Sequence, residues 1–212
     1  MLIQSSILKV DAATYPAELE KYPVVGGNSA AQNLEGFAYT ATNAVYQASV
    51  TFTSQNVGAK RYDRMKKIMG ACYLTTFVVS VLVAGFLILF HEPLLSLYGV
   101  APGAPGSAEQ IAFESGRMRF QILMTTYSIL AVMEVGSGIL RGLGKSLTST
   151  IISLAGTCVF RVAWVYTVFA SVGTLLSVFL SYPISWALCG ACHFLFSLHT
   201  LKKHKRMEAV TE

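Results

Sequence analysis

The feature that most constrains this chain is a segment, residues 30–56, that is long enough to cross a bilayer yet carries many polar side chains. Five cations follow it within residues 60–67. A chain that crosses lipid must satisfy its backbone hydrogen bonds internally, so we expect this segment to be a helix. Polar side chains on such a helix are tolerated where they face protein or water. The segment therefore predicts an integral membrane protein that lines an aqueous path.

The rest of the 212-residue chain indicates several membrane crossings. Charged residues make up 13% of the sequence, against about 25% in an ordinary soluble domain. A helix needs about 20 apolar residues to cross about 30 Å of hydrocarbon. Three further stretches meet this need, and the last is long enough for two crossings: residues 68–90, 120–140 and 146–201. The predicted fold class is all-α, a polytopic transmembrane helical bundle of about five spans.

The basic residues predict how this bundle is oriented. Eleven of the sixteen Lys and Arg residues fall in three clusters, which follow the first, third and fifth expected spans: residues 60–67, 141–145 and 202–206. The opposite loops, 91–116 and 170–173, contain no Lys or Arg. Because basic loops stay in the cytoplasm, we expect a multi-pass plasma-membrane protein with its N-terminus outside and its C-terminus cytoplasmic. The net charge of +5 therefore indicates lipid headgroups as partners and no nucleic acid.

The same reading divides the chain into three parts. Residues 1–27 are expected to form a non-spanning segment that holds the remnant of a truncated helix, since the apolar run 1–8 is too short to cross a bilayer. No signal peptide is evident there. Residues 28–201 are expected to form the five-helix lobe, and residues 202–212 a basic cytoplasmic tail.

The candidate binding residues lie on the first expected span and share one face at 100° per residue. This face is expected to point into the lobe interior or into a cavity, where it would contact substrate or a coupling cation. Its members are Glu35, Tyr39, Asn43, Tyr46 and Gln47.

Three charged residues lie well inside expected spans: Glu35, Glu134 and Arg161. Each costs roughly 2.5–3.5 kcal/mol at a helix centre, so a lipid-facing position without a partner is unfavourable. The two glutamates are candidates for coupling a cation or for contacting substrate. The alternative is a structural pair in the interior, for example between Glu35 and Arg161. Arg161 is expected to be structural, because Trp164 lies three residues further on the same helix face.

The sequence offers no enzyme chemistry. It contains no catalytic triad, no paired-carboxylate site and no metal-ligand spacing, so we expect no catalytic residues, no metal and no cofactor. The spacing of Cys189 and Cys192 matches a redox motif, but it lies in an apolar helix and indicates packing. The glycine-rich segment 138–146 lacks the strand and the four-residue spacing of a phosphate-binding loop. His193 is expected to be a hydrogen-bonded packing residue.

Several motifs in order resemble the second half of multidrug and toxic compound extrusion (MATE) transporters over residues 28–200. They are the polar helix that ends in SQNVGA before a basic turn, the segment ILRGLGKS, and FRVAW with Arg161 and Trp164. The resemblance implies one lobe of a two-lobe antiporter that exchanges Na⁺ or H⁺ for organic cations or drug-like compounds. It also implies that the partner is a missing N-terminal lobe or a second copy.

Two other functions remain open at this stage. The chain could be a truncated membrane protein that transports nothing, or a lobe of a lipid-linked saccharide flippase of the same superfamily. Some members of the family carry an acidic residue about three turns before the LRG motif. In this sequence Leu130 occupies that neighbourhood, and Glu134 lies one turn nearer the cytoplasm. Glu35 is therefore the preferred cation-site candidate, on burial grounds.

Overall fold

The protein is described by a computed structural model that covers residues 2–14 and 22–211. Every regular element within those ranges is helical, which confirms the all-α prediction. In chain order the elements are α1 (Leu2–Thr14), α2 (Pro23–Gly58), α3 (Met65–Leu89), α4 (His91–Leu97), α5 (Ala108–Thr125), α6 (Tyr127–Gly142), α7 (Ser146–Ser153), η1 (Leu154–Val159), α8 (Phe160–Trp164), η2 (Val165–Phe169), α9 (Ala170–Val172) and α10 (Leu175–Thr211).

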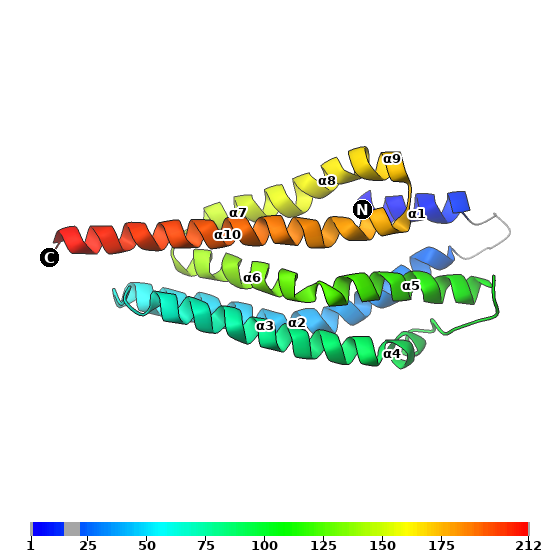
Figure 1. The fold of residues 1–212 in the computed structure, drawn as a ribbon, viewed down its shortest axis with the longest axis horizontal. Helices are drawn as coiled ribbons and strands as arrows, with labels where there is room; N and C mark the ends of the chain where they lie inside the picture. Colours follow the sequence, from blue (N-terminus) through cyan, green and yellow to red (C-terminus); the bar gives the residue numbers. More distant parts are fainter. Residues whose placement is uncertain (1, 15–21, 212) are drawn as a thin grey trace.

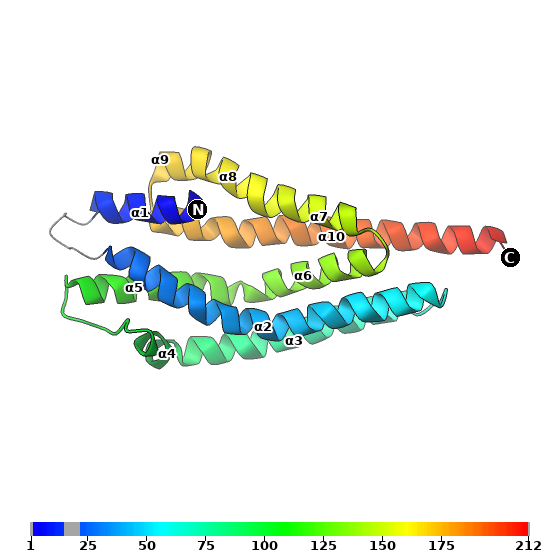
Figure 2. The ribbon, with the colours of Figure 1, turned by 180° about the vertical axis from the view of Figure 1, so that it is seen from behind.

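The long helices run side by side along one axis of the molecule (Figure 1). Helix α2 packs against α3, α5 and α6, and α10 packs against α6. The segment from α7 to α9 lies along α10, and the short helix α1 sits beside α2 and α10 (Figure 2). The result is a single bundle in which α6 joins the α2–α3 side to the α10 side.

The structure supports three or four of the about five predicted spans. Within the described residues, three helices are long and apolar enough to cross a membrane: Met65–Leu89, Ser146–Val172 and Leu175–His204. The pair α5 and α6 meets the same requirement as one bent span. Helix α2 is long enough at 36 residues, but its polar side chains keep it out of this group. Three other helices pack along it, and its membrane crossing stays a prediction.

The third predicted span, residues 120–140, is not one straight helix. The chain bends by 52° between α5 and α6, with Thr126 at the break. The hydroxyl groups of Thr125 and Thr126 donate to the carbonyl oxygens of Gln121 and Ile122, each at 2.7 Å. Such back-bonding competes with the helical hydrogen bonds and bends helices. The sequence contains no Gly or Pro at this point, so periodicity alone did not predict the bend.

The boundaries of two elements extend beyond the expected ones. Helix α2 starts at Pro23, a residue suited to the first helical turn because it has no N–H to leave unpaired. The Asp11 carboxylate accepts a hydrogen bond from the backbone N–H of Val25 at 3.3 Å, which ties α1 to the start of α2. At the other end, α10 continues as a helix through the segment expected to be a tail. Residues 15–21, within the expected N-terminal segment, lie outside the described residues.

The outer surface of the bundle is apolar, as lipid contact requires. Large hydrophobic side chains on α3 are strongly exposed, including Leu74, Phe77 and Leu82, and so are Leu195 and Phe196 on α10. The interior, by contrast, contains many small hydroxyl residues, such as the fully buried Ser80 and Ser149. Small and hydroxyl residues inside and large apolar ones outside are typical of helices that pack within a membrane.

Helices α2 and α5 approach each other closely at two glycines, Gly27 and Gly116. A Cβ atom added to Gly116 on α5 would lie 2.7 Å from the carbonyl oxygen of Gly27 on α2. A Cβ on Gly27 would in turn collide with the carbonyl oxygen of Ala112. Only glycine permits this separation, which brings the polar side chains of α2 within reach of α5.

Candidate functional site

An ion pair at the centre of the α2–α5 contact anchors the candidate site. Arg119 on α5 holds Glu35 on α2 with two parallel hydrogen bonds, from Nε to Oε1 at 2.6 Å and from Nη2 to Oε2 at 2.8 Å. Its third nitrogen, Nη1, donates to Oδ1 of Asn28 at 2.9 Å. The Arg119 side chain is 3% exposed and that of Glu35 16%. The two charges neutralise each other in a nearly buried, bidentate arrangement.

The structure contains an interior pair of Glu35 with an arginine, but the arginine is Arg119 and not Arg161, the example that the sequence offered. Arg119 lies just before the expected span 120–140, in a stretch that also contains Glu114 and Arg117. Those two side chains are indeed exposed, but Arg119 lies 200° further round the helix than Arg117 and faces α2. Arg161, the expected partner, contacts neither glutamate in the described part of the chain.

Arg161 on α8 instead contacts α10. Its guanidinium carbon lies 4.1 Å from the centre of the Tyr182 ring, and its Nε donates to the hydroxyl oxygen of Ser185 at 3.1 Å. The expected stacking on Trp164 does not form. Trp164 packs against Phe160 and donates its indole N–H to the carbonyl oxygen of Ser177 at 2.9 Å. The π-helical turns η1 and η2 on either side of α8 widen the helix and change the directions of its side chains.

The predicted polar face of α2 is divided by the bundle. Glu35, Asn43 and Tyr46 are half-buried, whereas Tyr39 and Gln47 are exposed. The stripe that α2 buries most deeply consists of small residues at the edge of that face, such as Ala31, Ala38 and Thr42. The bundle therefore buries only part of the polar face of α2.

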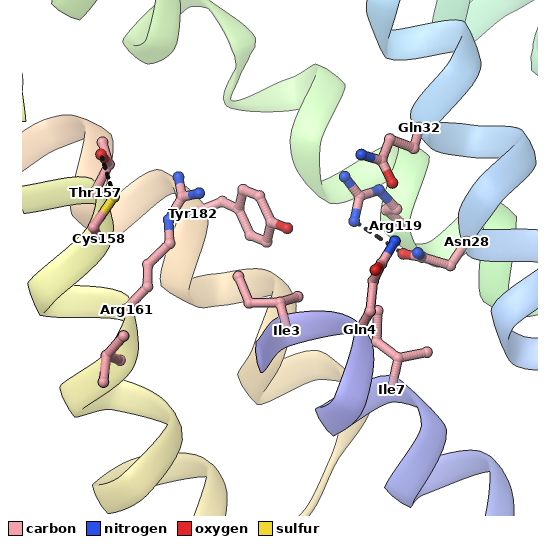
Figure 3. Close-up of a pocket in the computed structure, with 11 residues that line it drawn as sticks. Ile3, Gln4, Ile7, Asn28, Gln32, Arg119, Thr157, Cys158, Arg161 and Tyr182 are labelled. Carbon is pink, nitrogen blue, oxygen red and sulfur yellow. Dashed lines mark hydrogen bonds between the residues drawn. The ribbon is translucent and has the colours of Figure 1, made fainter. Parts of the chain in front are cut away.

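Two cavities lie beside the ion pair. The first, which we call the arginine cavity, measures about 370 Å³ and is lined by residues of α1, α2, α5, η1, α8 and α10, among them Gln4, Asn28, Gln32, Arg119, Arg161 and Tyr182 (Figure 3). The second, the aromatic cavity, measures about 200 Å³ and is lined by Glu35, Tyr39, Tyr127, Tyr182, Trp186 and apolar side chains. Tyr182 lines both cavities.

Glu134 lies close to the aromatic cavity but does not line it. It is half-buried on α6, one helical turn beyond Leu130, which is part of the cavity wall. Among the described residues, the only salt bridge joins Arg119 to Glu35, so Glu134 has no cation within ion-pair distance. It is thus the carboxylate of α6 that is available to a cation.

The remaining polar groups of the interior are arranged for packing. His193 is fully buried and its Nε2 lies 3.3 Å from the carbonyl oxygen of Ser149. The four cysteines are free, and the Sγ of Cys189 contacts the carbonyl oxygen of Ile152. No group of three metal-binding side chains is present among the described residues.

The sequence reasoning missed Arg119, Asn28, Tyr182 and Trp186 as site residues. A helical wheel of this segment places Arg119 on the same side as the apolar residues Phe120 and Leu123, and all three are buried. That pattern could have identified Arg119 as an interior residue. The aromatic residues of α10 gave no separate signal, because they lie in a continuous apolar run.

The structure is thus a helical bundle with an internal ion pair and cavities on either side of Tyr182. The MatE family model matches residues 22–167, more than half of the chain. The chain therefore belongs to the MatE family of transporters, as the motifs predicted. No curated protein sequence matches it.

Solved structures show the same fold. The chain is similar to a multidrug resistance MATE family transporter of the MOP superfamily in an outward-facing conformation, with a TM-score of 0.77 and 14% identity. It is also similar to a MOP superfamily transporter from Pyrococcus furiosus, reported with reverse polarity of its binding pocket (TM-score 0.79, 16% identity), and to a MATE protein in complex with MaL6 (TM-score 0.75, 17% identity). The matches cover 96–97% of this chain but only 42–45% of those chains. The chain thus spans less than half the length of these transporters.

Proposed function

We propose that this chain is one lobe of a cation-coupled antiporter that exports organic cations or drug-like compounds across the plasma membrane. The observation that carries the proposal is the aromatic cavity. Four aromatic side chains, those of Tyr39, Tyr127, Tyr182 and Trp186, surround a small space beside Glu35. Aromatic faces attract organic cations and also accommodate their apolar parts. The family membership of the chain supports export as the activity.

Glu134 is the residue that we assign to coupling. The sequence favoured Glu35 for this role, but both carboxylate oxygens of Glu35 are occupied by Arg119. Glu134 has no such partner among the described residues and lies one turn from the aromatic cavity. A half-buried carboxylate without a counter-ion can bind Na⁺ or a proton and release it when its surroundings change.

Transport requires a second lobe. Alternating access in transporters built from repeats involves one bundle rocking against another around a site at their interface. The exposed part of the polar face of α2, with Tyr39 and Gln47, supplies one side of such an interface. Its partner is a complementary lobe or a second copy of this chain.

The test compares the chain alone with the chain co-expressed with a complementary lobe of a MatE-family transporter. Ethidium efflux is measured from cells that lack their own efflux pumps. We expect no efflux from the chain alone and measurable efflux from the pair. Robust efflux from a demonstrably monomeric chain would contradict the two-lobe proposal. A complex that assembles but transports nothing would favour the non-transporting alternative.

Glu134→Gln tests the coupling role in the assembled complex. The change keeps the shape of the side chain and removes its charge, so efflux should lose its dependence on Na⁺ or on pH. Glu114→Gln on the exposed face of α5 is the matched control and should leave that dependence intact. A Glu134→Gln complex with unchanged coupling would assign the role to another residue.

A further inference from the structure

The arginine cavity carries a positive charge that the protein does not balance. Two guanidinium groups line it, those of Arg119 and Arg161, and no Asp or Glu does. Glu35 neutralises Arg119 from the other side of the helix contact. Arg161 has no carboxylate within ion-pair distance in the described part of the chain. The cavity therefore holds one uncompensated positive charge.

The two arginines also differ in how many of their nitrogens have hydrogen-bond acceptors. All three nitrogens of Arg119 donate to acceptors on α2. Arg161 uses only its Nε, toward Ser185, whose hydroxyl group in turn donates to the carbonyl oxygen of Tyr182 at 2.8 Å. Its two terminal nitrogens, with four N–H groups, have no acceptor among the described residues. A half-buried guanidinium without a counter-ion is costly within a membrane, and an anion in the cavity would lower that cost.

The walls of the cavity combine polar and apolar side chains. Gln4 and Gln32 bring amide groups to the side where Arg119 lies, and amide N–H groups can donate to an anion (Figure 3). Ile3, Ile7 and Val162 supply apolar wall. The volume of about 370 Å³ is within the range of small-molecule sites.

We propose that the arginine cavity binds a monoanionic group, a carboxylate or a phosphate ester, that pairs with Arg161. A planar guanidinium whose two terminal nitrogens are free binds such oxygens in a bidentate manner. The group can come from an anionic lipid headgroup or from a free anion. The site has the opposite charge preference to the aromatic cavity, and the proposal does not rest on the proposed export of cations.

The experiment uses a thiol that the cavity itself provides. Cys158 lines the arginine cavity and is exposed, whereas Cys192 on α10 is exposed but does not line it. The full chain is purified in an uncharged maltoside detergent and treated with iodoacetamide, and mass spectrometry follows the alkylation of each cysteine. The probes, added at constant ionic strength, are inorganic phosphate, phosphatidylglycerol and, as the zwitterionic control, phosphatidylcholine. Cys192 serves as the internal control in the same molecule.

Anionic probes should slow the alkylation of Cys158 and leave that of Cys192 unchanged. Protection by phosphate would show that a free anion is sufficient to occupy the cavity. Protection by phosphatidylglycerol alone would identify a lipid headgroup as the ligand. Either result supports the site. No protection by either anionic probe, or equal protection by phosphatidylcholine, would overturn it.

Variants then test the role of Arg161. Arg161→Gln should weaken protection at least about tenfold in probe concentration, because it removes a charge-assisted bidentate contact. Arg117→Gln makes the same charge change at an exposed position outside the cavity and should not weaken it. Arg161→Lys keeps the charge, so it should retain protection even if Arg161→Gln fails to fold. Unchanged protection in Arg161→Gln, or its complete loss in Arg161→Lys, would contradict recognition by the charge.

Discussion

At the scale of single residues, Arg119 and Arg161 occupy contrasting positions on either side of Tyr182. The guanidinium carbons lie 5.2 Å and 4.1 Å from the Tyr182 ring centre. Arg119 is buried and fully hydrogen-bonded, while Arg161 is half-buried and mostly unbonded. One arginine therefore stabilises the bundle, and the other is available to a ligand.

Glu35→Gln should destabilise the protein, because it leaves the buried Arg119 without a counter-ion. Breaking one side of a buried pair typically costs roughly 3–5 kcal/mol. We expect a lower unfolding temperature and less monodisperse protein in detergent, measured by thermal unfolding and size-exclusion chromatography. The double variant Glu35→Gln/Arg119→Gln should recover part of the loss, since neither charge then stays buried alone.

The matched control is Glu92→Gln, which removes a carboxylate from the exposed surface of α4. It should change stability little. If Glu35→Gln proves as stable as the parent chain, the ion pair is not a stabilising element. Reduced coupled transport in such a stable variant would instead restore the role that the sequence assigned to Glu35.

The sequence predicted Glu35 as an interior residue but could not identify its partner. A charge within a span must find a counter-charge, and three candidates were present, Arg117, Arg119 and Arg161. Which one faces α2 depends on the rotation of α5 about its axis. That rotation is set by the glycine contact and by the packing of Phe120 and Leu123, which are long-range features.

At the scale of the elements, the contact of α2 with α5 depends on Gly27 and Gly116. Because each glycine lies against the backbone of the other helix, the separation of the two helices leaves no room for a methyl group at either position. The hydrogen bonds between Arg119 and Glu35 require the same separation. The glycines therefore position the site without belonging to it.

Gly116→Ala should push α5 away from α2 and destabilise the bundle by about 1–3 kcal/mol, the usual range for overpacking. The added Cβ would lie 2.7 Å from the carbonyl oxygen of Gly27. Gly36→Ala on α2 is the matched control, because a Cβ there has no neighbour within 4 Å. It should be neutral or stabilising by up to about 1 kcal/mol through helix propensity. Thermal unfolding in detergent measures both, and equal effects would contradict the packing explanation.

The positions of the helices could be predicted well from the sequence, but their bends and π-helical turns could not. Length and apolarity placed α3 to within a few residues, whereas α10 continues well beyond the expected end at residue 201. The bend at Thr126 and the π-helical turns around Arg161 depend on side chains that compete for backbone carbonyls and on neighbouring helices. These features changed the partners of Arg161, so the site could be predicted only in part.

At the scale of the whole molecule, the fold brings the three basic segments to one end. The turn after α2, the turn after α6 and the end of α10 all lie toward the end where the C-terminus is found, whereas α4 and α9 lie toward the other end (Figure 1). The charge asymmetry seen in the sequence is thus an asymmetry between the two ends of one bundle. It supports the cytoplasmic assignment of the basic end.

Cysteine labelling tests this orientation. In a cysteine-free background, Ala104→Cys, in the loop between α4 and α5, should react with a membrane-impermeant maleimide added to intact cells. Ser146→Cys at the start of α7 should react only after the cells are opened. The Ala104 side chain makes no capping contact, whereas the hydroxyl group of nearby Ser107 caps α5 by accepting from the N–H of Gln110 at 3.2 Å. The opposite labelling pattern would invert the topology.

The Glu35–Arg119 pair also has a consequence for the order in which the helices assemble during synthesis. The two residues are 84 positions apart, so at 5–20 residues per second Glu35 leaves the ribosome roughly 4–17 s before its partner. During that interval α2 carries an unpaired carboxylate and an uncovered polar face, and neither is stable in lipid. Helix α2 therefore reaches its final place in the bilayer only when α5 arrives, and the bundle assembles from two helices that the membrane receives at different times.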